Sequence, residues 1–448
     1  MSAAPIVERI ELLSDRWVET AGERLRALVE ENASKLGDVS FSICETFSDA
    51  PPHLGWPENV GVWHARIKGE TVEYGKGRID DADLYITGDY TAGLPVSQAV
   101  GAVAMERAQQ LAAHLFPDRL TRMEGVPPTG MMERVFLSLH DYLAQRTMGN
   151  PDLQHRIERQ GLASNVRELR ENGYTILHNV IPEAMADELR ELCLDAVHGK
   201  GRELTRLDRS DCMGLLTRGR PFEEIAQHPT LLTAMESVLG TGMVLSCLSA
   251  AVKGPGPSAV PPHTDYSYVP EPYPEFALNG VAVWALDDWR EESGPTYIMP
   301  GTQRMRRAPD PEKDDLSGAV PAIMGKGSVV FFAQGVWHWQ GERTEPGERV
   351  SMHNIYSRPF MRSHDNFVNL DPLVLNRNSP VLSSLTGQDD PFEKSSHYGH
   401  DAERAVYMDN LVNWGKERAD GGYEASYKIQ GKKHVESADE KDPALATE

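Results

Sequence analysis

The stretch VPPHTDYSYVPEPYPEF, residues 260–276, decides how the rest of the chain is interpreted. It places a histidine and an aspartate two positions apart, after two prolines and before several aromatic residues. In a strand, positions i and i+2 point to the same face, so His263 and Asp265 can direct an imidazole and a carboxylate to one point. This pair predicts part of a metal site, and a further ligand has to come from elsewhere in the chain.

A second histidine stands in the segment GSVVFFAQGVWHWQGERTEPGERVSMHNIYSRP, residues 327–359. The segment is typical of a strand, a turn with His338, a second turn and a strand that opens with Arg349. Two histidines and one carboxylate form the facial triad that binds iron(II) and leaves open positions for substrates and oxygen. A planar guanidinium stays charged and pairs bidentately with a carboxylate. An enzyme that uses 2-oxoglutarate needs such a cation for the distal carboxylate, and we expect a hairpin to place Arg349 so that it faces the same cavity.

The composition excludes some partners. The chain has 448 residues and a formal net charge of −22, which disfavours nucleic acid and anionic membrane surfaces. We find no apolar run long enough to span a bilayer and no secretory signal at the amino terminus. A cytoplasmic protein is expected. The four scattered cysteines (Cys44, Cys193, Cys212 and Cys247) are expected to be reduced thiols.

The pattern along the chain predicts three parts. Residues 1–150 are expected to form an α+β domain: a helix over 6–35, a small antiparallel meander, and helices near 95–116 and 129–147. Residues 151–386 begin with a helix, a strand, a turn and a helix, with Gly173 as a helix C-cap and Pro182 at a helix start. Short strands follow from about 243, which favours a sandwich or barrel. Residues 387–448 are expected to be a helical segment and a mobile tail.

The region from about 166 to 362 resembles the phytanoyl-CoA dioxygenase family of iron(II)/2-oxoglutarate-dependent oxygenases. The resemblance lies in ENGYTILHNVIPEAMADELR, the HTD triplet, SGPTYIMPGTQR and GSVVFFAQGVWH followed by an arginine. It implies a double-stranded β-helix, a jelly-roll core with helices packed outside. It also implies that His263, Asp265 and His338 are the iron ligands and that Arg349 anchors 2-oxoglutarate.

The resemblance implies further contacts to 2-oxoglutarate for which a simpler reading stays open. Trp284 matches an aromatic position lining the co-substrate site, with core packing as the alternative. Thr296 and Ser249 are candidates for polar contacts, with local hydrogen bonds as the alternative. His353 shares a strand face with Arg349 and is either a cavity residue or a structural one. The family can use a serine two residues after the distal histidine, and Gln340 stands there instead.

The segment GVWHARIKGETVEYGKGRIDDADLYITGDYTAGLPV, residues 61–96, is similar to the sterol-carrier-protein-2-like fold. That resemblance implies an α+β domain with an apolar tunnel, or a domain that serves assembly. It slightly favours a hydrophobic substrate.

Together these features predict an enzyme that uses iron(II), 2-oxoglutarate and oxygen. The expected reaction is oxidation of an unactivated C–H bond in a small apolar metabolite, most simply a hydroxylation, with release of succinate and carbon dioxide. The intact carboxylate favours this over halide transfer, but desaturation, cyclisation and epoxidation are not separated by the residues. Two alternatives remain: a non-catalytic protein that binds a hydrophobic ligand, and a cupin-type metal dioxygenase that does not use 2-oxoglutarate. An oligomer is compatible with the sequence.

Overall fold

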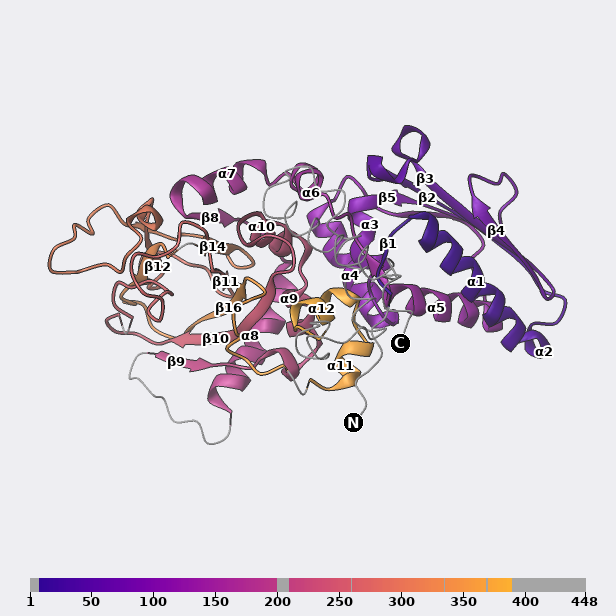
Figure 1. Cartoon of the computed structure of the whole chain (residues 1–448). Coiled ribbons are helices and arrows are strands. Elements are labelled where there is room, and N and C mark those ends of the chain that lie inside the picture. Colours follow the sequence, from indigo (N-terminus) through magenta and orange to yellow (C-terminus); the bar gives the residue numbers. More distant parts are fainter. Residues whose placement is uncertain (1–7, 200–208, 259, 334, 368–369, 389–448) are drawn as a thin grey trace, which may run out of the picture. The chain divides into compact units, whose positions relative to one another are not determined.

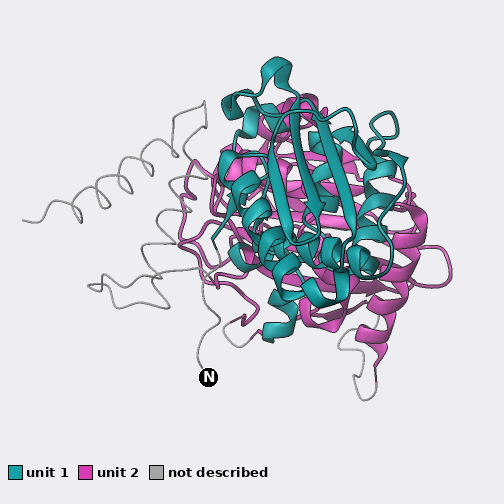
Figure 2. Ribbon diagram, turned by 90° about the vertical axis from the view of Figure 1, so that its right-hand side faces the viewer, with its two compact units in different colours: residues 1–156, 371–384, 389–448 teal, residues 157–370, 385–388 magenta. Residues whose placement is uncertain are grey.

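The computed structural model describes residues 8–199, 209–258, 260–333, 335–367 and 370–388 (Figure 1). The chain divides into two compact units, which Figure 2 shows in teal and magenta. Among the described residues, unit 1 runs to Arg156 and includes Asp371–Ser384, and unit 2 comprises Ile157–Leu370 and Leu385–Gln388. The predicted boundaries at 150 and 386 stay a proposal. The helical segment predicted within 387–448 lies outside the described residues from 389 onward.

Unit 1 contains a five-stranded sheet in the order β4-β3-β2-β5-β6. Its strands are β2 (Ser40–Ser48), β3 (Gly61–Lys68), β4 (Thr71–Lys76), β5 (Leu84–Asp89) and β6 (Arg122–Gly125). The predicted antiparallel meander is wrong for one pair, because β5 runs parallel to β2. A side chain fixes that pairing: the Asp83 carboxylate accepts hydrogen bonds from the Ser42 backbone N–H at 2.7 Å and hydroxyl at 2.8 Å.

The helices of unit 1 are α1 (Asp15–Glu31), α2 (Ala33–Leu36), α3 (Tyr90–Ser97), α4 (Ala102–Leu115), α5 (Gly130–Ala144) and α11 (Pro372–Asn376). Helices α1, α4 and α5 begin later than the ranges predicted from the sequence. Helix α1 starts after Ser14, whose hydroxyl accepts from the Trp17 N–H at 3.1 Å as an N-cap does. The residues before it form β1 (Ile10–Glu11), which pairs with β7 (Thr147–Met148).

One acidic side chain lies on the helix-covered face of the unit 1 sheet. Glu45 on β2 stands directly across from Trp63 on β3, and the Trp63 indole N–H donates to its carboxylate at 2.8 Å. Trp63 packs edge-on against Trp17 of α1, with ring centroids 5.4 Å apart. Burial raises the pKa of Glu45 to about 7, because a carboxylate loses its hydration there.

Unit 2 is built on a six-stranded sheet in the order β8-β14-β11-β16-β10-β9. Its strands are β8 (Tyr174–Leu177), β9 (Arg209–Cys212), β10 (Val244–Lys253), β11 (Asn279–Ala285), β14 (Val329–Ala333) and β16 (Arg349–Ser357). A three-stranded sheet in the order β13-β12-β15 contains β12 (Thr296–Met299), β13 (Val320–Pro321) and β15 (Trp337–Gln340). Val283 and Phe332 of the large sheet and Ile298 of the small sheet share one buried cluster. The two sheets therefore enclose a common interior, as in a jelly roll, and the predicted α+β class is confirmed.

Helices pack on the large sheet of unit 2: α7 (Ala163–Asn172) contacts β8 and β14, and α8 (Glu183–His198), α9 (Arg220–Ala226) and α10 (Pro229–Leu239) contact β10, β11 and β16. Two further helices, α6 (Leu153–Arg159) and α12 (Pro380–Leu385), fall partly in each unit. Helix α7 ends at Gly173, whose φ of 81° lies in the left-handed region that glycine adopts freely. The predicted C-cap is confirmed. Across the described ranges, no helix combines the length and apolar character needed to cross a bilayer.

Candidate metal centre

The two predicted histidine ligands are held opposite each other by the backbone. His263 donates its N–H to the His338 carbonyl at 3.0 Å, and His338 donates to the His263 carbonyl at 3.1 Å. The segment around His263 thus extends the small sheet beyond β15. The strand expected for the His263–Asp265 stretch is reduced to this single bridge, and Asp265 opens a turn. The turn still brings the carboxylate back towards both imidazoles.

Both imidazole rings present the same nitrogen to a common point. His263 Nδ1 lies 2.9 Å from the Pro261 carbonyl, and His338 Nδ1 lies 3.0 Å from the Val336 carbonyl. A carbonyl only accepts, so in the neutral rings Nδ1 carries the proton and Nε2 keeps its lone pair. Metal-ligating histidines are oriented in this way by a backbone acceptor on the other nitrogen.

The aspartate completes a compact donor set. His263 Nε2 lies 3.8 Å from one Asp265 oxygen, and His338 Nε2 lies 3.8 Å from the other. One donor atom from each residue falls within 4.8 Å of the other two. Burial lowers the pKa of His338 to about 4, although Asp265 opposes the shift, so that ring is a neutral ligand at physiological pH. Two imidazoles and a carboxylate on one side are the donor set that suits iron(II).

Arg349 lies on the interior face of the large sheet at the first position of β16. Its side chain is 3% exposed, its guanidinium carbon lies 4.4 Å above the Trp289 ring, and it donates to the Gly294 carbonyl. Its Nε is buried without a hydrogen-bond partner, and among the described residues no carboxylate forms an ion pair with it. Burial, with the charges of Arg209 and Arg343 nearby, lowers its pKa to about 9. An isolated buried cation is costly, which is the condition that an anionic ligand would relieve.

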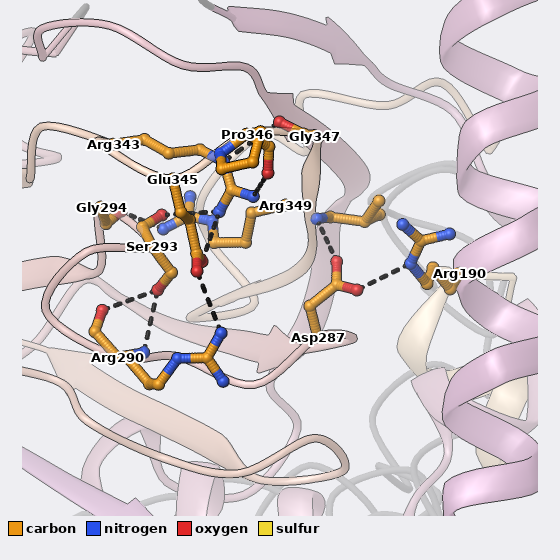
Figure 3. Close-up of polar contacts among 11 residues, drawn as sticks. Arg190, Asp287, Arg290, Ser293, Gly294, Arg343, Glu345, Pro346, Gly347 and Arg349 are labelled. Carbon is orange, nitrogen blue, oxygen red and sulfur yellow. Dashed lines mark hydrogen bonds and ion pairs between the residues drawn. The ribbon is translucent and has the colours of Figure 1, made fainter.

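The chain reaches Arg349 by changing sheets and not by the hairpin that the sequence predicted, because β15 and β16 belong to different sheets. Figure 3 shows how the connecting loop is fastened. Arg343 donates to the carbonyls of Pro346 at 2.8 Å and Gly347 at 3.1 Å and pairs with Glu345 at 3.0 Å. Arg343 therefore holds the turn, and Arg349 is the arginine that lacks a carboxylate partner.

The small sheet contributes two polar residues beside the metal centre. Thr296 on β12 lies directly across from Gln340 on β15, and Ile298 lies across from His338. Positions two apart share a face, so Thr296 and Gln340 face the interior with His338. Gln340 is 4% exposed, and neither atom of its side-chain amide has a hydrogen-bond partner. The sequence identified Thr296 as a candidate but treated Gln340 only as a departure from the family pattern.

The large sheet contributes Ser249 and His353, which lie directly across from each other on β10 and β16, with Val283 of β11 in the same row. This row faces the interior, since Val283 belongs to the interior cluster. The outer-face neighbours Met352 and Asn354 are fully buried, whereas His353 keeps some exposure although its strand is central in the sheet. The exposure of His353 is therefore towards the interior, which retains open space beside this row.

Trp284 does not join these residues, and its predicted role in lining the co-substrate site is wrong. It alternates with Val283, so its side chain points to the outer face of the large sheet. There its indole N–H donates to the Asn354 side chain at 3.0 Å, and its ring packs edge-on against His228 at 5.6 Å between centroids. Trp284 belongs to the packing between the sheet and the helices, which is the alternative that the sequence left open.

The fold and the donor set define a class: a jelly-roll protein with a candidate His–Asp–His metal centre between its sheets. Residues 169–349 match the family model described as phytanoyl-CoA dioxygenase (PhyH), and this match includes all three donors and Arg349. The resemblance stated from the sequence is confirmed for this part of the chain. The resemblance of residues 61–96 to the sterol-carrier-protein-2-like fold stays a prediction.

Sequence relatives match part of the chain. The dioxygenase af480 of Aspergillus fumigatus is 29% identical over 168 residues, which are 37% of this chain and 54% of that protein. The dioxygenase cdmD of Talaromyces verruculosus is 30% identical over 118 residues, which are 25% of this chain and 36% of that protein. The chain thus spans about half the length of the first relative and a third of the second.

Solved structures match at lower identity. The non-heme alpha ketoglutarate dependent carbocyclase SnoK from nogalamycin biosynthesis is 21% identical, with a TM-score of 0.37 over 44% of this chain and 86% of that one. HygX from Streptomyces hygroscopicus, solved with nickel and 2-oxoglutarate bound, is 13% identical, with a TM-score of 0.40 over 45% of this chain and 89% of that one.

Proposed function

We propose that this protein is an iron(II)- and 2-oxoglutarate-dependent dioxygenase that oxidises a C–H bond of a small molecule, most simply by hydroxylation. The observation that carries the proposal is the combination of two features in one interior. Three metal donors lie within 4.8 Å of one another, and a buried arginine without a carboxylate partner lies in the same jelly-roll barrel. The match of residues 169–349 to the phytanoyl-CoA dioxygenase family supports it.

The donor set fits iron, and the buried polar atoms fit a dicarboxylate. His263 and His338 would bind the metal through Nε2, and Asp265 would add the anionic ligand that balances part of its charge. Arg349 would pair with the far carboxylate of 2-oxoglutarate, for which its unpaired Nε is suited. When bound, iron and 2-oxoglutarate supply the oxidising chemistry, with succinate and carbon dioxide as the co-products. The chain would hold these groups, keep the His338 imidazole neutral and restrict the access of water.

For the substrate we propose only that it is a small molecule that enters the barrel beside Ser249 and His353, where the interior retains open space. The apolar substrate favoured by the sequence stays a prediction. Its support is the exposed aromatic side chain of Tyr268, which follows Asp265 in the chain and packs against the His364 ring at 6.1 Å. The polar row of Ser249 and His353 indicates that such a substrate also offers a hydrogen-bonding group.

The test is anaerobic and needs no substrate. Iron(II) is added to the full chain, then 2-oxoglutarate, and the visible charge-transfer absorption of a keto acid chelated to iron(II) is recorded. We expect the band in the wild type, its loss in His338→Ala, and its appearance only at higher 2-oxoglutarate concentration in Arg349→Gln. Trp284→Phe is the matched control, because Trp284 faces away from the centre.

The other outcomes separate the alternatives. Iron binding without the band would contradict the use of 2-oxoglutarate and favour a cupin-type dioxygenase. No iron binding would leave the non-catalytic binding protein. An unchanged band in His338→Ala would contradict the assignment of the site.

A further inference from the structure

A further histidine in the barrel interior, His353, presents an acceptor atom to the open space beside the metal centre. We propose that its Nδ1 accepts a hydrogen bond from a neutral donor group of the substrate, such as a hydroxyl, and so turns one C–H bond towards the metal centre. The inference rests on the proposed function and deepens it, because it gives the chemical class of a group that the substrate must carry.

The position of His353 brings it close to the metal centre without making it a ligand. It lies in an interior row of the large sheet with Val283 and Ser249 and keeps some exposure towards the open space. The charge of Asp265, one of the three metal donors, acts on its imidazole, although His353 is not part of the donor set. A molecule that fills the space beside this row would therefore contact His353 and face the metal centre.

The surroundings of His353 keep its ring neutral. Burial lowers its pKa to about 3, and the neighbouring guanidinium groups of Arg209 and Arg349 act in the same direction. The carboxylates of Asp211 and Asp265 oppose the shift without reversing it. A neutral imidazole carries a single proton, so one of its two nitrogens donates a hydrogen bond and the other accepts one.

The hydrogen bonds of Ser351 decide which nitrogen carries that proton. The Ser351 hydroxyl donates its only hydrogen to the Ala251 carbonyl at 3.4 Å, because a carbonyl can only accept. The same hydroxyl oxygen lies 3.4 Å from His353 Nε2 and is left to accept there, so Nε2 carries the proton. The rings of His263 and His338 in the metal centre have the opposite arrangement, with the proton on Nδ1.

Nδ1 of His353 is consequently an acceptor that still needs a donor. Among the described residues no group donates to it, and it is not one of the polar atoms that are fully enclosed without a partner. A substrate carboxylate would set its own lone pairs against Nδ1, and a substrate ammonium group would add a positive charge beside two guanidinium groups. A neutral hydroxyl avoids both conflicts.

The experiment uses two probes that differ in one hydrogen-bond donor. Cyclohexanol offers a hydroxyl, and its methyl ether keeps the oxygen but lacks the donor. The full chain is loaded with manganese(II) and 2-oxoglutarate, and binding is measured from the paramagnetic broadening of the proton signals of each probe, which reports binding near the metal. The variants are His353→Phe, which removes both nitrogens, and His353→Asn, whose side-chain oxygen can take the place of Nδ1. Met352→Leu, on the outer face of the same strand, is the matched control.

We expect the wild type and Met352→Leu to bind cyclohexanol about two- to tenfold more tightly than the ether, which is the range that one neutral hydrogen bond gives. His353→Phe should remove this preference, and His353→Asn should keep most of it. The Kd for 2-oxoglutarate, measured by calorimetry, should stay within about twofold in every variant, because the charge-assisted contact of Arg349 is unchanged. In metal-free protein with isotopically labelled histidine, nitrogen NMR should show that the signals lost in His353→Asn belong to a ring protonated at Nε2.

Four results would each overturn the proposal while leaving the proposed function intact. They are equal binding of the two probes by the wild type, no broadening of either probe, a preference for cyclohexanol that persists in His353→Phe, and a His353 ring protonated at Nδ1. Failure of the manganese-loaded wild type to bind 2-oxoglutarate at all would instead contradict the proposed function itself.

Discussion

Replacing Arg349 by methionine should weaken 2-oxoglutarate binding without destabilising the ligand-free protein. The pKa of Arg349 falls from 12.5 to about 9, which corresponds to a cost of about 5 kcal/mol for keeping the charge buried. Two contacts offset it: the Trp289 ring contributes about 1–2 kcal/mol and the hydrogen bond to the Gly294 carbonyl about 1.5–3 kcal/mol. Arg349→Met removes the cost of the buried charge together with both contacts, so the free energy of unfolding should stay constant or rise by about 0–2 kcal/mol.

The effect on the co-substrate should be large and of opposite sign. Removing one partner of a buried, hydrogen-bonded charge pair costs about 2 kcal/mol or more, so the Kd for 2-oxoglutarate should rise at least about 30-fold. Urea unfolding gives the stability of the ligand-free protein, and calorimetry with manganese(II) gives the Kd. Manganese affinity serves as the internal control and should not change.

The reasoning would be refuted by a loss of about 3 kcal/mol or more of stability together with an unchanged Kd. A substitution that removes one partner of a satisfied buried ion pair destabilises a protein by this amount. Such a result would make Arg349 a structural cation whose partner is within the protein.

Three further perturbations test other parts of the description. Trp284→Phe should cost about 1 kcal/mol of stability through the lost bond to Asn354 and leave 2-oxoglutarate affinity within about twofold by calorimetry. The carboxyl of Glu45 has its pKa raised from 4.5 to about 7, so its contribution to stability is full below pH 4.5 and is lost as the pH rises through 7. At pH 8, Glu45→Gln should therefore raise the free energy of unfolding, measured by urea denaturation, by roughly 1–3 kcal/mol, and at pH 4.5 it should leave that free energy unchanged. A gain of equal size at both pH values would contradict the burial of the charge. Gly173→Ala should lower the melting temperature, with a cost of about 1 kcal/mol or more, because its φ is 81° and the added methyl would meet Gln303.

The metal donors could be predicted from the sequence because their spacing along the chain and the chemistry of their side chains are local properties. His263 and Asp265 stand two apart, and the type of each side chain limits what it can bind. The turn that opens at Asp265 replaced the expected strand, yet both side chains still meet. His338 followed from the strand and turn pattern of residues 327–359 and from the family resemblance, whereas the backbone bridge to His263 was not visible in the sequence.

The error at Trp284 has a physical cause. All seven residues of β11 are buried, because one face meets the interior and the other meets the helices. A strand that is apolar on both faces has no alternation, so its sequence does not say which residues point inward. Only the pairing with β16 separates Val283, inside, from Trp284, outside.

The remaining differences depend on long-range pairing. The parallel match of β5 with β2 and the passage of the chain from β15 to β16 across two sheets join segments whose local patterns fit several arrangements. The unpaired amide of Gln340 is likewise a property of its neighbours in space. No feature of its own stretch of sequence distinguishes it from a glutamine with partners.

The reciprocal hydrogen bonds between His263 and His338 have a consequence for protein engineering. They join peptide groups, which are the same in every residue, so the spacing of the two ligands does not depend on what the intervening chain carries. Substitution of the exposed Tyr268 and Phe276, which leaves the buried Tyr266 and Tyr273 in place, should then change which molecules are accepted while the two histidines stay in register. An insertion within 261–263 would instead turn one ring to the opposite face of the sheet. Libraries aimed at new specificities are best confined to the exposed positions of the loop.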